Sequence, residues 1–231
     1  MTARVGVVVF PGSNCEHDVV EALRSLGGDA ELLWHDDPDL RGVDAVVIPG
    51  GFAHGDYLRP GAIARFSPVM GTVSSFAAEG GPVIGICNGF QVLTEAGLLP
   101  GALMRNASLR FVCRDVFLRV EGKGSIFTRG YRQGEVVRFP VAHHDGNYVA
   151  DDDTISRLED EDRVAFRYVD VAGKPTAAAN PNGSRNNIAG ILSESRSVLG
   201  LMPHPERLAD HILGGTDGQA MFDALAALAP A

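Results

Sequence analysis

A cysteine lies between two glycines in the segment PVIGICNGFQ, residues 82–91. The β-branched run 83–86 predicts a buried strand, and the apolar spacing that begins at Phe90 predicts a helix. A side chain on such a strand-to-helix turn stands at its tip, and flanking glycines leave room there for substrate. A thiol at this point also meets the positive end of the helix, which favours the thiolate. Cys87 is therefore a candidate nucleophile, and a buried cysteine that merely ends a core strand is the alternative.

A histidine and a carboxylate follow each other closely in the segment MPHPE, residues 202–206. A thiolate needs a proton donor for its leaving group and a partner that orients the donor. Pro205 disfavours the α region for His204, and residues two apart in an extended chain point to the same side. Glu206 is thus expected to fix the tautomer of the His204 imidazole. Cys87, His204 and Glu206 together predict a catalytic triad, whereas His204 alone would more often be structural.

A covalent mechanism of this kind also needs N–H donors for a developing oxyanion. One donor is the backbone N–H after the nucleophile, at Asn88. A second could come from the PGGF turn at residues 49–52, which follows the predicted strand DAVVI. That turn would lie at the carboxyl edge of a parallel sheet, where such folds bind ligands. An ordinary tight turn is the alternative.

The first half of the chain alternates predicted strands and helices. Strands are predicted at residues 4–10, 30–34, 44–48 and 83–86, and helices at 16–26 and 69–78. This alternation implies a parallel sheet with right-handed crossovers. The expected fold class is α/β, a mostly parallel open sheet with helices on both faces.

The middle of the chain changes to short alternating runs. Residues 109–120, 136–141 and 164–169 predict antiparallel strands, separated by turn-forming stretches at 121–124 and 151–153. Residues 188–192 and 198–202 then return to the core, and 217–228 predict a closing helix. We expect a single domain over residues 1–231, with an antiparallel insertion at about 105–170.

The composition narrows the class of protein. No apolar run in the 231 residues approaches the length of a membrane span. Cys15, Cys87 and Cys113 are far apart, so neither a disulfide framework nor a cysteine-based zinc site is expected, and a reducing, cytoplasmic setting fits best. The net charge of −9 argues against nucleic-acid binding.

The charge is uneven along the chain. The segment from Arg105 to Arg138 contains eight basic side chains and only three acidic ones. Such a run is a solvated face of a hairpin or a docking surface for another protein, and the sequence does not separate the two.

Several motifs together resemble a known family. The segments GICNGFQ, PGGF and PHPE are similar to those of class I, triad-type glutamine amidotransferase domains. More particular stretches resemble the glutaminase subunit of phosphoribosylformylglycinamidine synthase, namely GDYLR at 55–59, GAIAR at 61–65, NASLRF at 106–111 and NIAGI at 187–191. The likeness runs from residue 11 to residue 207.

The resemblance implies a flavodoxin-like class I amidotransferase fold and a role for each residue of the triad. Cys87 would be the nucleophile, His204 the acid and base, and Glu206 its orienter. Glutamine would be hydrolysed to glutamate and ammonia through a cysteine thioester. The resemblance gives no role to His143 and His144. In this segment His144-Asp145 stands where Gly-Glu is commoner in the family.

The resemblance also implies the residues that bind the substrate. Backbone N–H groups near Gly51 or Phe52, together with Asn88, would hold the oxyanion. Gln91 matches a position that contacts the substrate glutamine in such domains. No metal is expected in the site.

The implied partner is a larger synthetase subunit. It would use the ammonia, ATP and Mg²⁺ to make formylglycinamidine ribonucleotide in de novo purine biosynthesis, and a small third subunit often completes such assemblies. No cofactor is expected in this chain, since residues 10–14 lack the phosphate-binding loop pattern. Other possibilities are a glutaminase serving another synthetase, such as one making GMP or a vitamin precursor, a cysteine hydrolase of similar fold, or a non-catalytic module.

Overall fold

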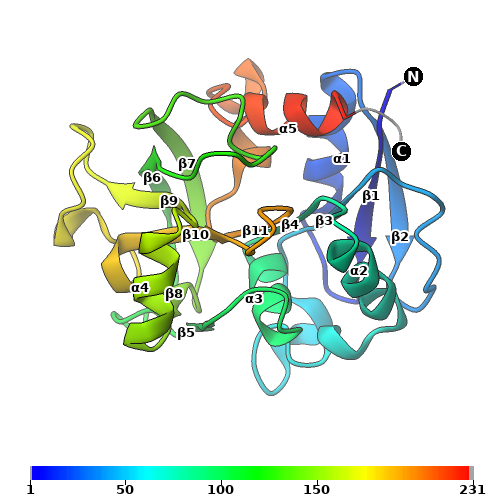
Figure 1. The fold of residues 1–231 in the computed structure, drawn as a ribbon, viewed down its shortest axis with the longest axis horizontal. Coiled ribbons are helices and arrows are strands. Elements are labelled where there is room, and N and C mark those ends of the chain that lie inside the picture. The colour runs from blue at the N-terminus through cyan, green and yellow to red at the C-terminus, as the bar shows by residue number, and fades with distance from the viewer. Residues whose placement is uncertain (1, 229–231) are drawn as a thin grey trace.

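Nine strands pair into one sheet, in the order β2-β1-β3-β4-β11-β10-β9-β6-β7 (Figure 1). The computed structural model describes residues 2–228. The strands of this sheet are β1 (Arg4–Val9), β2 (Asp29–Trp34), β3 (Ala45–Ile48), β4 (Val83–Ile86), β6 (Val112–Val120), β7 (Val136–His143), β9 (Val164–Val169), β10 (Ile188–Leu192) and β11 (Val198–Leu201). A small second sheet pairs β5 (Ala102–Met104) with β8 (Asn147–Val149).

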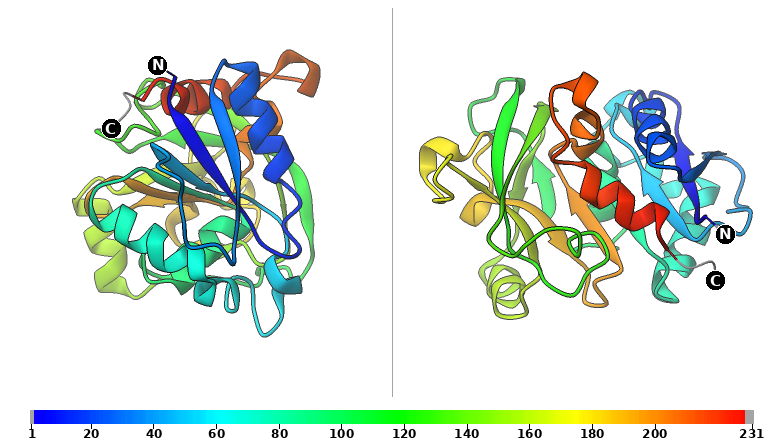
Figure 2. Two further views of the ribbon diagram at one scale, coloured as in Figure 1. Left: turned by 90° about the vertical axis from the view of Figure 1, so that its right-hand side faces the viewer. Right: turned by 90° about the horizontal axis from the view of Figure 1, so that it is seen from above.

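Helices cover both faces of the parallel half of the sheet (Figures 1 and 2). The α-helices are α1 (Glu16–Ser25), α2 (Pro68–Ala78), α3 (Asn88–Glu95), α4 (Asp152–Asp160) and α5 (Gln219–Ala226). Helices α1 and α5 contact each other and β1, while α3 packs on β3 and β4 from the other face. Between residues 2 and 228, none of these helices combines the length and apolarity needed to cross a bilayer.

The parallel half confirms the predicted fold class. Strands β2, β1, β3, β4 and β11 are mutually parallel, in the order of a flavodoxin-like sheet. Every residue of β3 and β4 is buried, as expected for strands covered on both faces. The carboxyl ends of neighbouring strands β4 and β11 therefore meet at one edge of the sheet.

The antiparallel strands continue this sheet instead of forming a separate layer. Strand β10 pairs antiparallel with both β11 and β9, and β6 joins β9 to β7. The backbone N–H of His204, just after β11, donates to the carbonyl of Pro140 in β7 at 2.8 Å. This contact brings β7 to the same sheet edge as the end of β4.

Two predictions in this region are wrong. The acidic stretch 151–153 begins helix α4 instead of forming a turn, because the Asp151 carboxylate accepts from Thr154 N at 2.7 Å as its N-cap. Acidic groups in the first turn also favour a helix N-terminus. The strand predicted from 109 starts at Val112, since Leu109 has a φ of 56° inside a turn.

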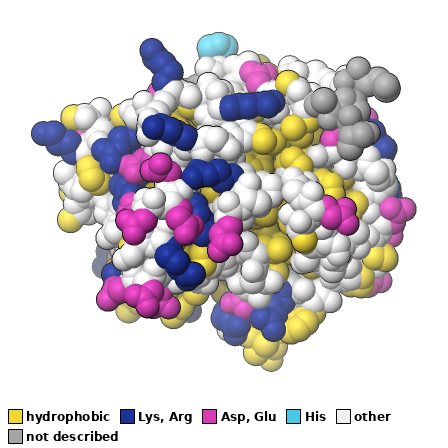
Figure 3. Space-filling view, viewed as in Figure 1, with side chains coloured by type: hydrophobic (Ala, Val, Ile, Leu, Met, Phe, Trp, Pro, Cys, Tyr) yellow, Lys and Arg dark blue, Asp and Glu magenta, His cyan; other side chains and the backbone are white. Residues whose placement is uncertain are grey.

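The basic run between Arg105 and Arg138 is not one uniform surface. Arg119 pairs with Glu121, Arg138 pairs with Asp115, and Arg129 donates to a carbonyl of α5. On the face shown in Figure 3, Lys and Arg side chains lie among Asp and Glu side chains over the antiparallel half. Part of the run therefore stabilises the fold, and docking of a partner there stays a prediction.

Candidate active site

Cys87 occupies the turn between β4 and α3, in a strained conformation with φ 52° and ψ −105°. Gly85 and Gly89 flank it, and both are required for packing. A Cβ on Gly89 would lie 1.9 Å from the carbonyl oxygen of Ile48, and one on Gly85 would lie 2.6 Å from Gly89. The glycines thus let α3 lie directly on the ends of β3 and β4, a role other than the one expected from sequence, which was to clear space for substrate.

The thiol of Cys87 points toward strand β7. Its sulfur lies 3.8 Å from the carbonyl oxygen of Ala142, and its backbone N–H donates to Leu201 at 2.8 Å. The residue is only 6% exposed. Cys87 is therefore enclosed by β7 on one side and by the end of β11 on another.

His204 and Glu206 form a buried pair at the end of β11. Nδ1 of His204 lies 2.5 Å from Oε1 of Glu206, and each residue is 1% exposed. Glu206 is brought there by the short turn η5 (Pro205–Leu208), not by the extended chain that the sequence predicted. The tight turn that begins at Pro205 curls the carboxylate back onto the imidazole.

The electrostatics of this pair favour a charged imidazole. Burial disfavours the imidazolium, but the Glu206 carboxylate and then the sulfur of Cys87 outweigh it, so the pKa of His204 lies well above its ordinary value. The sulfur of Cys87 therefore lies close enough to the ring to influence its protonation, as the predicted triad requires. Nε2 of His204 has no hydrogen-bond partner among residues 2–228 and remains available to that thiol.

Asn88 and Gln91 form a buried amide network on α3. Asn88 Nδ2 donates to Gln91 Oε1 at 2.9 Å, and Gln91 Nε2 donates to the carbonyl of Asp145 at 2.6 Å. Asn88 Oδ1 accepts from Ala53 N at 2.9 Å. The network ties α3 to the loops on either side of the nucleophile, and direct contact of Gln91 with glutamine stays a prediction.

Gly51 and Phe52 of the PGGF turn were the alternative sources of the second N–H donor, and the structure engages one of them elsewhere. The Phe52 N–H donates to the carbonyl of Gly12 at 2.9 Å, so it is engaged within the fold. Gly51 has a φ of 141°, and a Cβ there would lie 2.8 Å from Ser13 and Asn14. Gly51 and Asn88 are the donors that this arrangement leaves for an oxyanion.

The sequence analysis missed two residues beside the imidazole. Cys15 is buried at the start of α1, and Arg207 Nη2 donates to its sulfur at 3.1 Å. Both residues lie within the stretch that carries the family resemblance. That resemblance was the one feature of the sequence that could have drawn attention to them.

His143, left without a role, lies close enough to His204 to feel its charge. Burial and the nearby charge of His204 lower its pKa to about 4, so the ring is neutral. Its Nδ1 lies 3.1 Å from Asn106 Oδ1. It is therefore a neutral, hydrogen-bonded side chain, and its role stays open.

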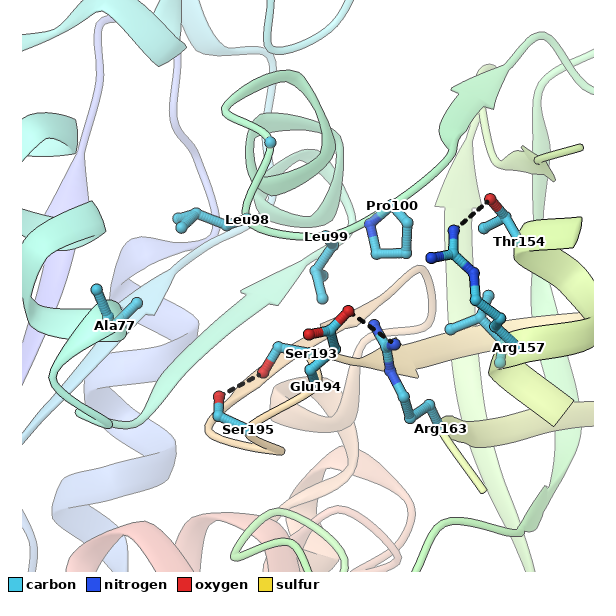
Figure 4. Close-up of a pocket in the computed structure, with 13 residues that line it drawn as sticks. Ala77, Leu98, Leu99, Pro100, Thr154, Arg157, Arg163, Ser193, Glu194 and Ser195 are labelled. Carbon is cyan, nitrogen blue, oxygen red and sulfur yellow. Dashed lines mark hydrogen bonds and ion pairs between the residues drawn. The ribbon is translucent and has the colours of Figure 1, made fainter. Parts of the chain in front are cut away.

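A pocket of about 460 Å³ lies at the opposite edge of the sheet, where β4 and β11 begin (Figure 4). Its polar side chains interact with one another: Arg157 donates to Thr154, and Arg163 pairs with Glu194 at 3.8 Å. It contains no thiol and no imidazole among its lining residues. The candidate triad lies at the other edge, the one that carries Cys87.

Comparison with known proteins agrees with this geometry. Residues 2–216 match the CobB/CobQ-like glutamine amidotransferase domain family. The chain is 57% identical over 230 residues to phosphoribosylformylglycinamidine synthase subunit PurQ of Ruegeria pomeroyi, covering 99% of this chain and 100% of that one. It is 58% identical over 222 residues to the protein of the same name from Chlorobaculum tepidum, covering 96% and 95%.

A solved structure shows the same fold. The chain superposes on a chain of the PurLQS structure from Thermotoga maritima with a TM-score of 0.87 and 42% identity, covering 97% of this chain and 98% of that one. Sequence, site geometry and fold agree. The chain belongs to the CobB/CobQ-like glutamine amidotransferase family and, within it, to the glutaminase subunits of phosphoribosylformylglycinamidine synthase.

Proposed function

We propose that this chain hydrolyses glutamine with Cys87 as nucleophile, His204 as acid and base, and Glu206 as the group that orients His204. One observation carries the proposal: the thiol and the buried His204–Glu206 pair meet at one sheet edge although they are far apart in sequence. The raised pKa of His204 supports a thiolate–imidazolium pair, the reactive form of a cysteine nucleophile.

The reaction proceeds in two halves. The Cys87 thiolate attacks the side-chain amide carbon of glutamine, and the tetrahedral intermediate collapses to a γ-glutamyl thioester. The His204 imidazolium gives its proton to the departing nitrogen, which leaves as ammonia. Neutral His204 then takes a proton from water as the water attacks the thioester. Glutamate leaves, and the thiolate–imidazolium pair is restored.

The backbone stabilises the oxyanion in both halves. The N–H groups of Gly51 and Asn88 are the proposed donors, and Asn88 begins helix α3, whose N-terminus favours negative charge. A donor of this kind is worth about 3 kcal/mol in the transition state. A side chain on Gly51 would collide with the backbone of Ser13 and Asn14, so the missing side chain lets that loop pack against the turn and hold it in place.

The ammonia is consumed by another subunit in our proposal. A larger synthetase subunit that binds ATP and Mg²⁺ receives it and makes formylglycinamidine ribonucleotide for purine biosynthesis, with a small third subunit in the assembly. The resemblance to a chain of PurLQS supports this arrangement. A cytoplasmic setting, suggested by the unpaired cysteines, stays part of the proposal.

The synthetase is expected to dock beside the end of β6. Exposed apolar side chains gather there in sequence, at Met104, Leu109 and Phe111, next to the exposed Arg110 and Arg114. This end of β6 pairs with the Ala142 end of β7, which contacts the sulfur of Cys87. A partner at this place would lie close to the point where ammonia is released.

Glutamine hydrolysis with and without the thiol tests the proposal. Cys87→Ser should lower kcat by about a thousandfold, because a hydroxyl is a far weaker nucleophile here. Cys113→Ser, which changes an exposed thiol, is the matched control and should leave the rate unchanged. Undiminished hydrolysis by Cys87→Ser would refute the mechanism. Activity on esters or peptides but not on glutamine would favour a cysteine hydrolase instead.

A further inference from the structure

A second thiol lies beside the triad, although the mechanism above does not use it. Cys15 is 2% exposed, and its sulfur accepts a hydrogen bond from Arg207 Nη2 at 3.1 Å. Its thiol also faces Asn14 Oδ1 at 3.3 Å. The sulfur, a ring nitrogen of His204 and a carboxylate oxygen of Glu206 all lie within 4.8 Å of one another. Cys15 therefore belongs to the immediate surroundings of the imidazole.

The thiol and the imidazole pack against the same glycine. A Cβ on Gly50 would lie 2.8 Å from Cε1 of His204 and 3.1 Å from the sulfur of Cys15. The backbone N–H of Cys15 also donates to the Gly50 carbonyl at 3.3 Å. The bare backbone of Gly50 thus holds the sulfur next to the edge of the ring.

We propose that Cys15 is a positioning residue for His204. Its sulfur, held in place by Arg207, keeps the ring in the orientation that directs Nδ1 to Glu206 and leaves Nε2 to the thiol of Cys87. Nε2 of His204 is buried and has no hydrogen-bond partner among residues 2–228. No hydrogen bond therefore fixes that side of the ring, and its orientation depends on the groups that pack against the ring elsewhere. The inference rests on the proposed function, because it assigns Cys15 a role through the catalytic base.

The charges around the ring give this role a measurable consequence. The groups that face His204 are Glu206, Cys87 and Cys15, with Arg207 beyond Cys15 and the neutral His143 nearby. After the opposing effect of burial, Glu206, Cys87 and then Cys15 raise the pKa of His204. Removal of the sulfur should lower that pKa. The alkaline limb of the rate profile, where the imidazolium is lost, should then move to lower pH.

The experiment measures kcat and KM for glutamine from pH 6 to 10 in the complex with the synthetase subunit. Cys15→Ala should move the alkaline limb down by about half a pH unit and lower kcat about tenfold, with KM changed less than about twofold. Cys15→Ser keeps an acceptor for Arg207 and should recover most of kcat. Thermal melts of each variant confirm that it is folded.

Two results would overturn the proposal. One is a Cys15→Ala profile that superimposes on that of the wild type. The other is a folded Cys15→Ala variant that loses activity while its alkaline limb stays in place, which would show a purely structural role. The Cys87→Ser variant distinguishes a failure of the positioning role from a failure of the proposed glutaminase mechanism. An active Cys87→Ser refutes the mechanism itself, whereas an inactive one with an unchanged Cys15→Ala profile refutes only the positioning role.

Discussion

The carboxylate of Glu206 is the triad residue for which charge and shape are most easily separated. Glu206→Gln keeps the size of the side chain but leaves the buried His204 imidazolium without its counter-charge, so the pKa of His204 should fall. We expect kcat for glutamine hydrolysis at pH 7.5 to fall by about 10²- to 10⁴-fold. Steady-state kinetics with a thermal melt of the variant check this. A loss smaller than about threefold would contradict the role given to Glu206.

A second carboxylate near the nucleophile carries a pH signature of its own. Burial, and then the charge of Asp145, raises the pKa of Asp56 to about 6, although Asn88 Nδ2 donates to it at 3.2 Å. The folded chain therefore binds this proton more tightly than the unfolded chain. Its contribution to stability falls as pH rises from about 4 to 6.

Replacement of this carboxylate should thus stabilise the protein at neutral pH. We expect Asp56→Asn to raise the free energy of unfolding by about 1 kcal/mol at pH 7, discounted for the water that reaches this half-buried side chain. The gain should disappear near pH 4. Urea unfolding at both pH values measures it, with Asp29→Asn, an exposed change on β2, as control. An equal effect at both pH values would be inconsistent with the raised pKa.

Residues that form continuous motifs were predictable, and those brought in from distant segments were not. Cys87, His204 and Glu206 stand in short segments whose residue types imply their chemistry. Cys15 reaches the imidazole only because β1 and β3 place its loop against Gly50. The N–H of Phe52 was predicted as an alternative oxyanion donor, yet the same loop occupies it through Gly12. Such pairings depend on tertiary contacts that no local pattern encodes.

At the scale of elements, Gly89 is the tighter of the two glycines that let α3 pack on the sheet. Gly89→Ala would put a Cβ 1.9 Å from the Ile48 carbonyl oxygen, so helix and strand must separate. We expect a loss of about 3 kcal/mol in the free energy of unfolding, with glutaminase activity lost as the Cys87 turn moves.

A matched glycine in another helix provides the control. Gly71 lies in α2, exposed, with nothing within 4 Å of its added Cβ. Gly71→Ala should stabilise the protein by about 0.5–1 kcal/mol, because alanine is the better helix residue. Denaturant unfolding of both variants gives the comparison. Equal effects at Gly89 and Gly71 would show that α3 is not held by close backbone contact.

The elements differ in how well their sequences encode them. Strands β3 and β4 are buried on both faces, and their short length and β-branched residues indicate strands. Helix α4 is short, and its three leading aspartates are as typical of a turn as of a helix N-terminus. The helix is stabilised by the capping hydrogen bond from Thr154 N to Asp151 and by the burial of Ile155 and Leu158. Strands β5 and β8 have three residues each, which is too short for an alternating apolar and polar pattern to be recognised.

At the scale of the whole molecule, the antiparallel strands reach the candidate active site. They extend the sheet from β11, and β7 returns to contact both the thiol of Cys87 and the backbone of His204. The sequence indicated these strands but not their return to the site, because pairing between distant strands leaves no local signature. The same continuity places the exposed end of β6 beside the site.

Docking of the synthetase on that end of β6 gives a prediction for the assembly. Arg110 and Arg114 are exposed there, and Arg114 pairs in register with Val141, next to the Ala142 that contacts the thiol. We expect the double variant Arg110→Glu, Arg114→Glu to lower stimulation of glutaminase by the synthetase at least about tenfold at low salt, because charges at a rim govern association. The basal rate of the isolated chain should stay unchanged.

A control at the far end of the same hairpin shows whether the position of the reversed charges matters or only the change in the net charge of the protein. Arg132→Glu reverses a highly exposed charge in the loop between β6 and β7, about 20 Å from Arg114 along the strand. It should leave the stimulation intact. Titration of each variant with the synthetase, with glutamate release as the readout, measures the stimulation of the double variant and of Arg132→Glu. The titration is repeated at higher salt. Wild-type stimulation should then decline, while the defect of the double variant persists. If assembly and stimulation survive the double reversal, the end of β6 is not the docking surface, and ammonia must leave the site past other loops.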